Sequence, residues 1–347
     1  MILSKKIRIA INGFGRIGKE VFRASFLEKY RNQIDVVVIN VGHTLDLKNE
    51  ALLFTYDSIH GKFPYPIDAE NNSFLIEWKR THLFGSRKPE EVDWKAYDID
   101  ILLECTGKFR SRSSLQAHMD NGIKKVLISA PGEEVDATIV YGVNESILTG
   151  KESIVSNASC TTNCLAPLAK VIEDHVGILS GQMTTVHSYT SDQNLLDGSH
   201  SDMRRARWAA LNIVPTKTGA AKAIGLVIPE LSGKLKWSAL RVPTPNVSLI
   251  ELTFLPKRAT SGEEINLLIQ NASRENPEII GYSSDPLVSS DFCGDPRSCI
   301  FDPALTSVVG IWDHQIVKVS AWYDNETAYS QRMLDVALCM QETTSFP

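Results

Sequence analysis

The stretch from Ile7 to Gly18 reads IRIAINGFGRIG, an apolar run of strand length followed by a glycine-rich turn. The turn fits the pattern G-x-G-x-x-G, with Gly13 first and Gly15 second, and helical spacing follows from Lys19 to Glu28. The first glycine permits a tight turn, the second lets a pyrophosphate approach the backbone, and the third allows close helix–strand packing. The stretch therefore predicts a dinucleotide-binding unit, with a plain glycine turn as the alternative.

Further apolar runs of strand length follow in the first half of the chain, at Val36–Ile39, Ile101–Leu103 and Val126–Ile128. Continuous apolar runs are typical of parallel strands that are buried on both faces of a sheet. The alternation of strand and helix patterns predicts the α/β class, with a Rossmann-type doubly wound parallel sheet. We expect this dinucleotide-binding domain to comprise residues 1–159, with a C-terminal helix within 326–347 packing back on it.

The pattern changes near residue 155, where a helical pattern begins at Cys160 and contains a conflicting Pro167. Longer strands with alternating polar positions then predict an α+β catalytic domain with a mixed sheet, over residues 160–325. These strands are Met183–His187, Ser238–Val242, Val247–Phe254 and Ile316–Trp322. Residues 188–212 are polar and rich in arginine, and we interpret them as a long functional or subunit-packing loop.

Composition excludes several classes of protein. The chain has 347 residues, a net charge of −5 and 43% hydrophobic residues, which is ordinary for a globular protein of two domains. The acidic balance argues against nucleic acid as a partner, and no apolar run is long enough for a membrane span. Six scattered cysteines are too few for a disulfide scaffold, so we predict a cytoplasmic location. They contain no C-x-x-C pair, so we predict no zinc site and no other metal.

The second strand of the dinucleotide-binding unit lacks a common feature. An Asp or Glu usually ends this strand and accepts the ribose 2′-hydroxyl, but here the strand ends with Asn40, Val41 and Gly42. A site without that carboxylate does not repel a 2′-phosphate, and His43 and Lys48 lie nearby in sequence. We therefore expect NAD or NADP as the cofactor.

Cys160 stands at the predicted helix start, between Ser159 and Thr161. The helix dipole and free N–H groups make a thiol there more acidic, and His187, at the end of a predicted strand, is the candidate general base. The alternative is a buried inert cysteine and an unrelated histidine. The hydroxyl-rich turn favours the functional interpretation because it is a natural anion site.

Several motifs together resemble the phosphorylating glyceraldehyde-3-phosphate dehydrogenase family, over about residues 6–340. They are the N-terminal glycine turn, SNASCTTN at Ser156–Asn163, VHSYT at Val186–Thr190, TGAA at Thr218–Ala221, RVPTP at Arg241–Pro245 and WYDNE at Trp322–Glu326. The resemblance implies that the Cys160 thiolate attacks glyceraldehyde 3-phosphate, that His187 takes a proton as hydride passes to nicotinamide, and that inorganic phosphate cleaves the thioester to 1,3-bisphosphoglycerate, a glycolytic reaction.

The resemblance also implies binding residues. Those for the substrate and for phosphate are Ser159, Thr161, Thr190, Arg205, Thr218, Gly219 and Arg241. Those for the cofactor are Gly13, Gly15, Arg16, Ile17, Arg87, Thr106, Ser129 and Asn325, with Ser199 of a neighbouring subunit reaching a 2′-phosphate. The family further implies a homotetramer in which the loop 188–212 packs on a neighbouring copy.

Three other functions remain open at this point. Erythrose-4-phosphate dehydrogenase has the same fold, but Thr190 and the TGAA segment favour the triose substrate. A Cys–His acyltransferase or hydrolase without redox chemistry would not need the glycine turn or Asn325. A binding protein without activity would not need Cys160, His187 and Arg241 together. Two positions differ from the pattern of the family. Asp192 stands where some members have a second threonine, and Val41 stands where others have an aspartate at the end of the strand.

Overall fold

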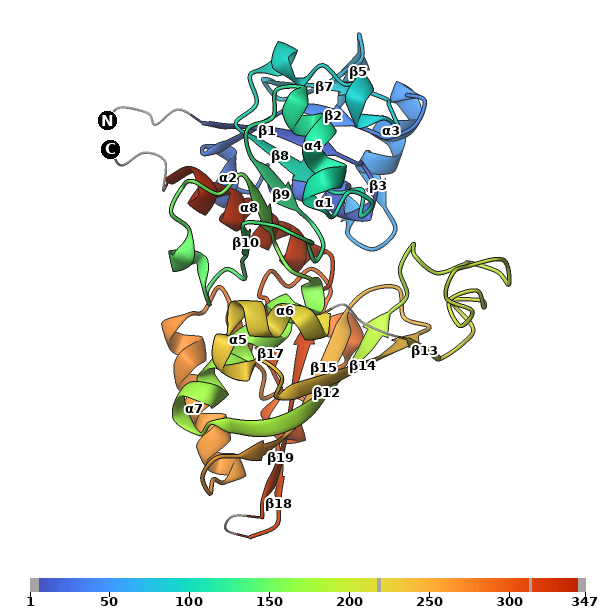
Figure 1. Ribbon diagram of the computed structural model, residues 1–347. Coiled ribbons are helices and arrows are strands. Elements are labelled where there is room, and N and C mark those ends of the chain that lie inside the picture. The colour runs from blue at the N-terminus through green and yellow to red at the C-terminus, as the bar shows by residue number, and fades with distance from the viewer. Residues whose placement is uncertain (1–5, 217–219, 312–313, 343–347) are drawn as a thin grey trace. The chain divides into compact units, whose positions relative to one another are not determined.

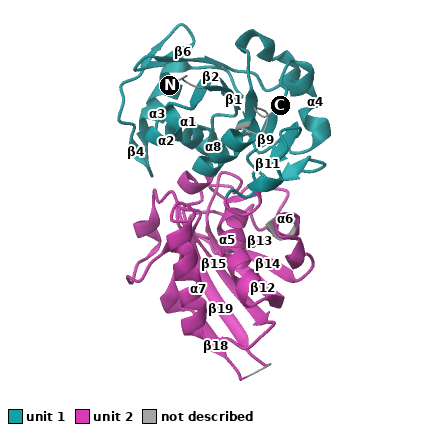
Figure 2. Cartoon of the chain, turned by 90° about the vertical axis from the view of Figure 1, so that its left-hand side faces the viewer, with its two compact units in different colours: residues 1–141, 145–158, 330–347 teal, residues 142–144, 159–329 magenta. Residues whose placement is uncertain are grey.

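The computed structural model describes residues 6–216, 220–311 and 314–342, and these form two compact units. Unit 1 comprises residues 1–141, 145–158 and 330–347, and unit 2 comprises residues 142–144 and 159–329 (Figure 2). In the part of the chain described, no helix is both long and apolar enough to cross a bilayer. All six cysteines are free thiols.

Unit 1 contains a nine-stranded sheet in the order β10-β11-β9-β8-β1-β2-β7-β6-β5 (Figure 1). From β10 to β7 the neighbours pair in parallel, and β7, β6 and β5 pair antiparallel. Its strands are β1 (Ile7–Asn12), β2 (Ile34–Asn40), β5 (Asp68–Glu70), β6 (Ser73–Ile76), β7 (Lys79–Phe84), β8 (Ile101–Glu104), β9 (Val126–Ile128), β10 (Ala137–Thr138) and β11 (Ile154–Ser156). A hairpin of β3 (Tyr56–Asp57) and β4 (Gly61–Lys62) is separate from this sheet.

The helices of unit 1 are α1 (Arg16–Ala24), α2 (Glu28–Arg31), α3 (Leu47–Thr55), α4 (Arg112–Asp120), the turns η1 (Pro89–Glu91), η2 (Trp94–Tyr97) and η3 (Glu145–Ile147), and most of α8 (Thr327–Glu342). In unit 1, α8 is attached by the hydroxyl of Tyr30, which donates to Asp335 at 2.9 Å. β8, β9 and β11 are buried along their whole length, and one core cluster joins Trp94 and Leu115 to β8 and β9. The doubly wound sheet predicted from the apolar runs is confirmed.

The predicted helix from Lys19 to Glu28 is wrong at both ends. α1 begins at Arg16 and ends at Ala24. The hydroxyl of Ser25 donates to the carbonyl of Phe22 at 2.7 Å, so a side chain competes with the helical hydrogen bonds where α1 ends. The chain then turns before α2.

Unit 2 contains an eight-stranded mixed sheet in the order β13-β14-β12-β15-β19-β17-β16, with β18 beside β19 (Figure 1). β12 pairs in parallel with β14 and antiparallel with β15, which pairs antiparallel with β19. The strands are β12 (Ile178–Ser188), β13 (Val214–Thr216), β14 (Leu235–Val242), β15 (Ser248–Pro256), β16 (Ile280–Tyr282), β17 (Cys299–Phe301), β18 (Ser307–Val309) and β19 (Ile316–Tyr323). The predicted mixed sheet is confirmed.

The helices of unit 2 are α5 (Cys160–His175), α6 (Ala220–Val227) and α7 (Gly262–Glu275), with the turns η4 (Pro229–Leu231), η5 (Ser289–Phe292) and η6 (Pro303–Leu305). α5 packs on the sheet and contacts both other helices. It continues through Pro167, which is buried with most of its neighbours, so packing compensates for the hydrogen bond that proline cannot donate. Residues 189–213 contain no helix or strand, as the loop prediction expects.

Candidate active site

Cys160 is the first residue of α5, and His187 lies near the end of β12. The Nε2 atom of His187 is 3.5 Å from the sulfur of Cys160. Ser159 caps the helix, because its hydroxyl oxygen accepts the backbone N–H of Thr162 at 3.1 Å. The fold therefore brings the predicted nucleophile and general base within reach of each other.

Opposing effects act on the protonation of this pair. Burial raises the pKa of the Cys160 thiol, while the Arg241 guanidinium and hydrogen bonds from Thr161 lower it. Burial and the positive charge of Arg241 lower the pKa of His187 to about 3. His187 is therefore a neutral imidazole that can accept a proton. The position of Cys160 at the start of α5 does not by itself ionise the sulfur, because desolvation of the thiolate opposes ionisation.

Arg241, on β14, contacts the histidine from its other side. Its Nη1 is 2.7 Å from Nδ1 of His187 and donates to the carbonyl of Ser188 at 2.8 Å. Its Nε is buried and has no hydrogen-bond partner in the described part of the chain. A buried N–H group without a partner is costly, so this atom is ready for an anionic ligand.

Arg205 is engaged differently. It forms an ion pair with the carboxylate of Asp192, and its Nε donates to the hydroxyl of Thr216 at 2.9 Å. A second carboxylate, of Asp202, lies 3.7 Å away. An anion that binds to Arg205 must therefore compete with a carboxylate of the same loop.

Of the other predicted phosphate ligands, Ser159 and Thr161 lie at the start of α5, and Thr190 lies in the same loop as Arg205. The hydroxyl of Thr161 is 2.9 Å from the hydroxyl of Tyr323, which is also 3.0 Å from that of Thr185. The backbone N–H of Thr190 donates to the side chain of Gln193 at 3.3 Å. The predicted ligands Thr218 and Gly219 lie outside the described residues.

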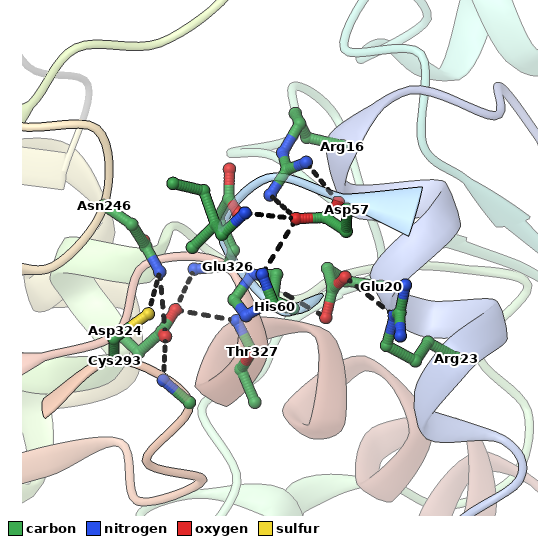
Figure 3. A network of polar contacts seen from close by, with 12 residues as sticks. Arg16, Glu20, Arg23, Asp57, His60, Asn246, Cys293, Asp324, Glu326 and Thr327 are labelled. Carbon is green, nitrogen blue, oxygen red and sulfur yellow. Dashed lines mark hydrogen bonds and ion pairs between the residues drawn. The ribbon is translucent and has the colours of Figure 1, made fainter. Parts of the chain in front are cut away.

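Asn325 is buried in the loop after β19. Its neighbour Asp324 fixes this loop by accepting hydrogen bonds from the backbone N–H groups of Glu326 and Thr327, each at 2.8 Å, and from the side chain of Asn246 at 2.9 Å (Figure 3). The position of Asn325 is thus set by contacts within unit 2.

The glycine turn of unit 1 has the geometry that a dinucleotide requires. Gly13 has φ +96°, and a Cβ atom there would lie 2.8 Å from the backbone nitrogen of Thr106. At Gly15 a Cβ atom would meet nothing within 4 Å, whereas at Gly18 it would lie 2.0 Å from the carbonyl oxygen of Gly13. The turn is therefore tightly packed at Gly13 and Gly18 and open at Gly15. Its residues fit a pyrophosphate bound beside Arg16 and Ile17.

A cavity of about 230 Å³ lies next to this turn, at the carboxyl ends of β1, β2 and β8. Its lining includes the predicted residues Gly13, Gly15, Arg87 and Thr106. Because β1 lies between β2 and β8, the site is at the topological switch point of the parallel sheet. Ser129, directly after β9, and the exposed Ser199 are not among the lining residues.

Sequence reasoning missed a buried carboxylate, Glu104, at the end of β8. One oxygen accepts the backbone N–H of Thr106 at 2.8 Å and also its hydroxyl, and the other accepts the amide of Asn12 at 2.5 Å. Asn12 in turn accepts the amide of Asn40 at 2.7 Å. A glutamate that ends an otherwise apolar strand was the only signal of this network.

Two further ion pairs stand beside the turn. Arg16 pairs with Asp57 of the β3–β4 hairpin, and one turn later the buried Glu20 lies 3.3 Å from Arg23 and 3.8 Å from His60 (Figure 3). Burial, opposed by His60 and Arg23, raises the pKa of Glu20 to about 7. These contacts attach α1 to the hairpin.

The strand-end position beside the cavity carries no acid. Val41 is buried, and Asn40 is engaged by Asn12 and Ser86. His43 is 3.0 Å from Glu50, whose other oxygen forms an ion pair with Lys19 at 3.1 Å. Lys48 is exposed on α3.

Comparison with known families gives two matches. Residues 7–112 match the glyceraldehyde 3-phosphate dehydrogenase NAD binding domain, and residues 159–325 match the glyceraldehyde 3-phosphate dehydrogenase C-terminal domain. Together the matches cover most of the chain.

Individual relatives are similar over almost their whole length. Glyceraldehyde-3-phosphate dehydrogenase of Pseudomonas aeruginosa is 52% identical over 337 residues, which are 96% of this chain and 98% of the relative. The chromosomal enzyme of that name from Cupriavidus necator is 48% identical over 96% of this chain and 98% of its own. Glyceraldehyde-3-phosphate dehydrogenase 2 of Trichormus variabilis is 50% identical over 97% and 99%.

Proposed function

The chain belongs to the glyceraldehyde-3-phosphate dehydrogenase family, and we propose that Cys160 and His187 carry its reaction. It is an NAD-dependent dehydrogenase that oxidises and phosphorylates glyceraldehyde 3-phosphate. The observation that supports these roles is the 3.5 Å separation between the sulfur and Nε2. Separations of this order are needed for proton transfer from a nucleophile to its base.

Each step assigns a proton or a bond to a residue of this chain. Cys160 adds to the aldehyde carbon, and its thiol proton passes to Nε2 of His187 and from there to the aldehyde oxygen, which becomes the hemithioacetal hydroxyl. For Nε2 to accept the thiol proton, Nδ1 must carry the ring hydrogen. The carbonyl of Ser188 then accepts both from Nδ1, 2.8 Å away, and from Nη1 of Arg241, which lies 2.7 Å from Nδ1. His187 then takes the hydroxyl proton of the hemithioacetal as it is oxidised to a thioester. Bound NAD supplies the acceptor for the hydride. Inorganic phosphate attacks the thioester carbon, the C–S bond breaks, and the acyl phosphate leaves.

The basic residues serve the two anions. We assign Arg241, with its unpartnered Nε, and Thr190 to the phosphate group of the substrate. Arg205 is assigned to inorganic phosphate, with Ser159, Thr161, Thr218 and Gly219.

Enzyme assays with the purified chain test these roles. With glyceraldehyde 3-phosphate, the absorbance of the reduced nicotinamide cofactor should increase, and the increase should require inorganic phosphate. The kcat/KM should be higher than with erythrose 4-phosphate. Cys160→Ser should abolish it, and His187→Asn should lower kcat about 100- to 10,000-fold. Full activity of Cys160→Ser would overturn the assignment.

The cofactor pocket supports use of NADP as well as NAD. No carboxylate ends β2, Glu50 forms an ion pair with Lys19, and Arg87 lies beside Ser86 in the lining. A 2′-phosphate therefore meets positive charge and no repulsion, with Ser199 of a neighbouring copy as a further ligand. The measurement is kcat/KM for both cofactors, and a strong preference for NAD would contradict the proposal.

We also propose a cytoplasmic homotetramer. Six free thiols suit a reducing compartment, and exposed apolar side chains in the 188–212 loop suit packing on another copy. They are Leu195, Leu196, Met203, Trp208 and Leu211. Light scattering should give a mass near four chains of 38.5 kDa, and a single-chain mass would refute it.

A further inference from the structure

Two buried serines converge on the side chain of Asn325. The hydroxyl of Ser188, at the end of β12, and that of Ser248, at the start of β15, each lie 2.9 Å from Oδ1 of Asn325. All three side chains are buried, with exposed fractions of 0%, 2% and 6%. The amide is therefore held inside the protein by two strands.

In the structure Oδ1 of Asn325 faces both serines, so each hydroxyl donates to it. The hydroxyl oxygen of Ser248 accepts the backbone N–H of Ser188 at 3.1 Å, so its own hydrogen is available to Asn325. Ser188 also donates its hydroxyl hydrogen to the same oxygen. The amide oxygen thus faces the serines, and the NH₂ group faces away from them.

The NH₂ group of Asn325 has no hydrogen-bond partner among the residues that the structure describes. An asparagine amide is nearly symmetric, and a 180° turn would exchange its donor for its acceptor. Only its neighbours decide which end it presents to a ligand. Here the end presented is a donor.

We propose that Ser188 and Ser248 are positioning residues, which orient Asn325 so that its NH₂ group donates to the carboxamide oxygen of bound nicotinamide. This rests on the proposed function, in which Asn325 holds that carboxamide. Without the two hydroxyls the amide can turn and place an oxygen against an oxygen. The orientation of the nicotinamide ring, and thus the ring face that receives the hydride, depends on this donor.

The backbone of Ser188 has a separate role, which makes the test selective. Its carbonyl accepts hydrogen bonds from Arg241 and faces Nδ1 of His187 at 2.8 Å. Ser188→Ala removes the hydroxyl and keeps this carbonyl. The variant therefore probes the contact with Asn325 and leaves the contacts of the catalytic base in place.

Binding measurements on the full chain separate positioning from a general structural role. Ser188→Ala, Ser248→Ala and the double variant are titrated with NAD and with ADP-ribose, which lacks nicotinamide. We expect the double variant to bind NAD about 3- to 10-fold more weakly, the value of one hydrogen bond, and ADP-ribose within twofold of wild type. Ser238→Ala, which removes an exposed hydroxyl 2.9 Å from Thr184 on the same sheet, is the control and should change neither.

A cycle with Asn325→Ala shows whether the serines act through it. In that background the serine substitutions should have no further effect on NAD binding. With deuterated aldehyde, the double variant should also give some of the opposite C4 diastereomer of the reduced cofactor. Equal weakening of NAD and ADP-ribose, unchanged NAD binding, or additive effects in the cycle would each overturn the proposal. Wild-type oxidation of the substrate is measured in the same series, and its absence would instead refute the proposed function.

Discussion

Glu20→Gln should change how the stability of the chain depends on pH. Glu20 is 4% exposed on α1, and its Oε1 lies 3.3 Å from Arg23 without forming a hydrogen bond. Burial raises its pKa from 4.5 to about 7 in spite of Arg23 and His60. Between these pH values the folded chain holds a proton that the unfolded chain has lost, so stability falls as the pH rises.

The size of the effect follows from the shift. A rise from 4.5 to about 7 corresponds to about 3 kcal/mol, present in full below pH 4.5 and lost by pH 7–8. Glutamine has no such proton, so the free energy of unfolding of the variant minus that of wild type should rise by about 3 kcal/mol over this interval. Urea unfolding at four pH values measures the difference, because other titrating groups are common to both proteins.

Glu28→Gln, which removes the same charge from an exposed position of α2, is the matched control. Its difference from wild type should stay flat across the same pH range. A flat or falling difference for Glu20→Gln would mean that Arg23 and His60 keep Glu20 ionised, and the argument from burial would then be wrong.

Four other substitutions test the two sites. Gly18→Ala should destabilise the chain by more than about 2 kcal/mol, because its Cβ would lie 2.0 Å from a carbonyl oxygen. Gly15→Ala should fold normally and bind NAD more weakly. Thermal unfolding measures the first effect, and titration with NAD measures the second. Asp192→Asn should lower the KM for inorganic phosphate by up to about fivefold, because Arg205 loses its competing carboxylate, and an unchanged or higher KM would speak against the role of Arg205. Glu104→Gln should raise the KM for NAD more than it changes kcat, with about 1–3 kcal/mol of lost stability, because Thr106 and Asn12 lose an ionised acceptor; a loss of kcat alone would contradict a positioning role.

Features that depend on local sequence could be predicted. The glycine turn Gly13–Gly18 stands between an apolar run of strand length and helical spacing, which is typical of a strand–turn–helix unit. The apolar runs indicated β1, β2, β8 and β9 within about two residues. The β5–β6–β7 meander was missed. Its strands are short, β5 and most of β7 are polar, and the turn between β5 and β6 depends on left-handed residues, Asn71 and Asn72, that apolar periodicity does not detect.

Features that depend on distant partners could not be predicted. Nothing local shows that Arg205 pairs with Asp192, that Glu104 joins two strands and a loop, or that burial opposes ionisation of Cys160. Ser188 stood within a recognised motif and Ser248 within a predicted strand, but their target is fixed only when two strands meet. Sequence thus indicated which residues carry the chemistry, and the fold shows what orients them.

The mixed sheet of unit 2 explains why these residues meet. β12, β14 and β19 run in one direction and β15 in the other, so the ends of three strands and the start of the fourth share one edge. That edge carries His187 and Ser188, Arg241, Tyr323 and Ser248, and the pairing register places His187 opposite Arg241 and Ser248 opposite Tyr323. A slip of one residue between any two strands would turn a catalytic side chain to the other face of the sheet. The chemistry of the site therefore depends on strand register as much as on the identity of its residues.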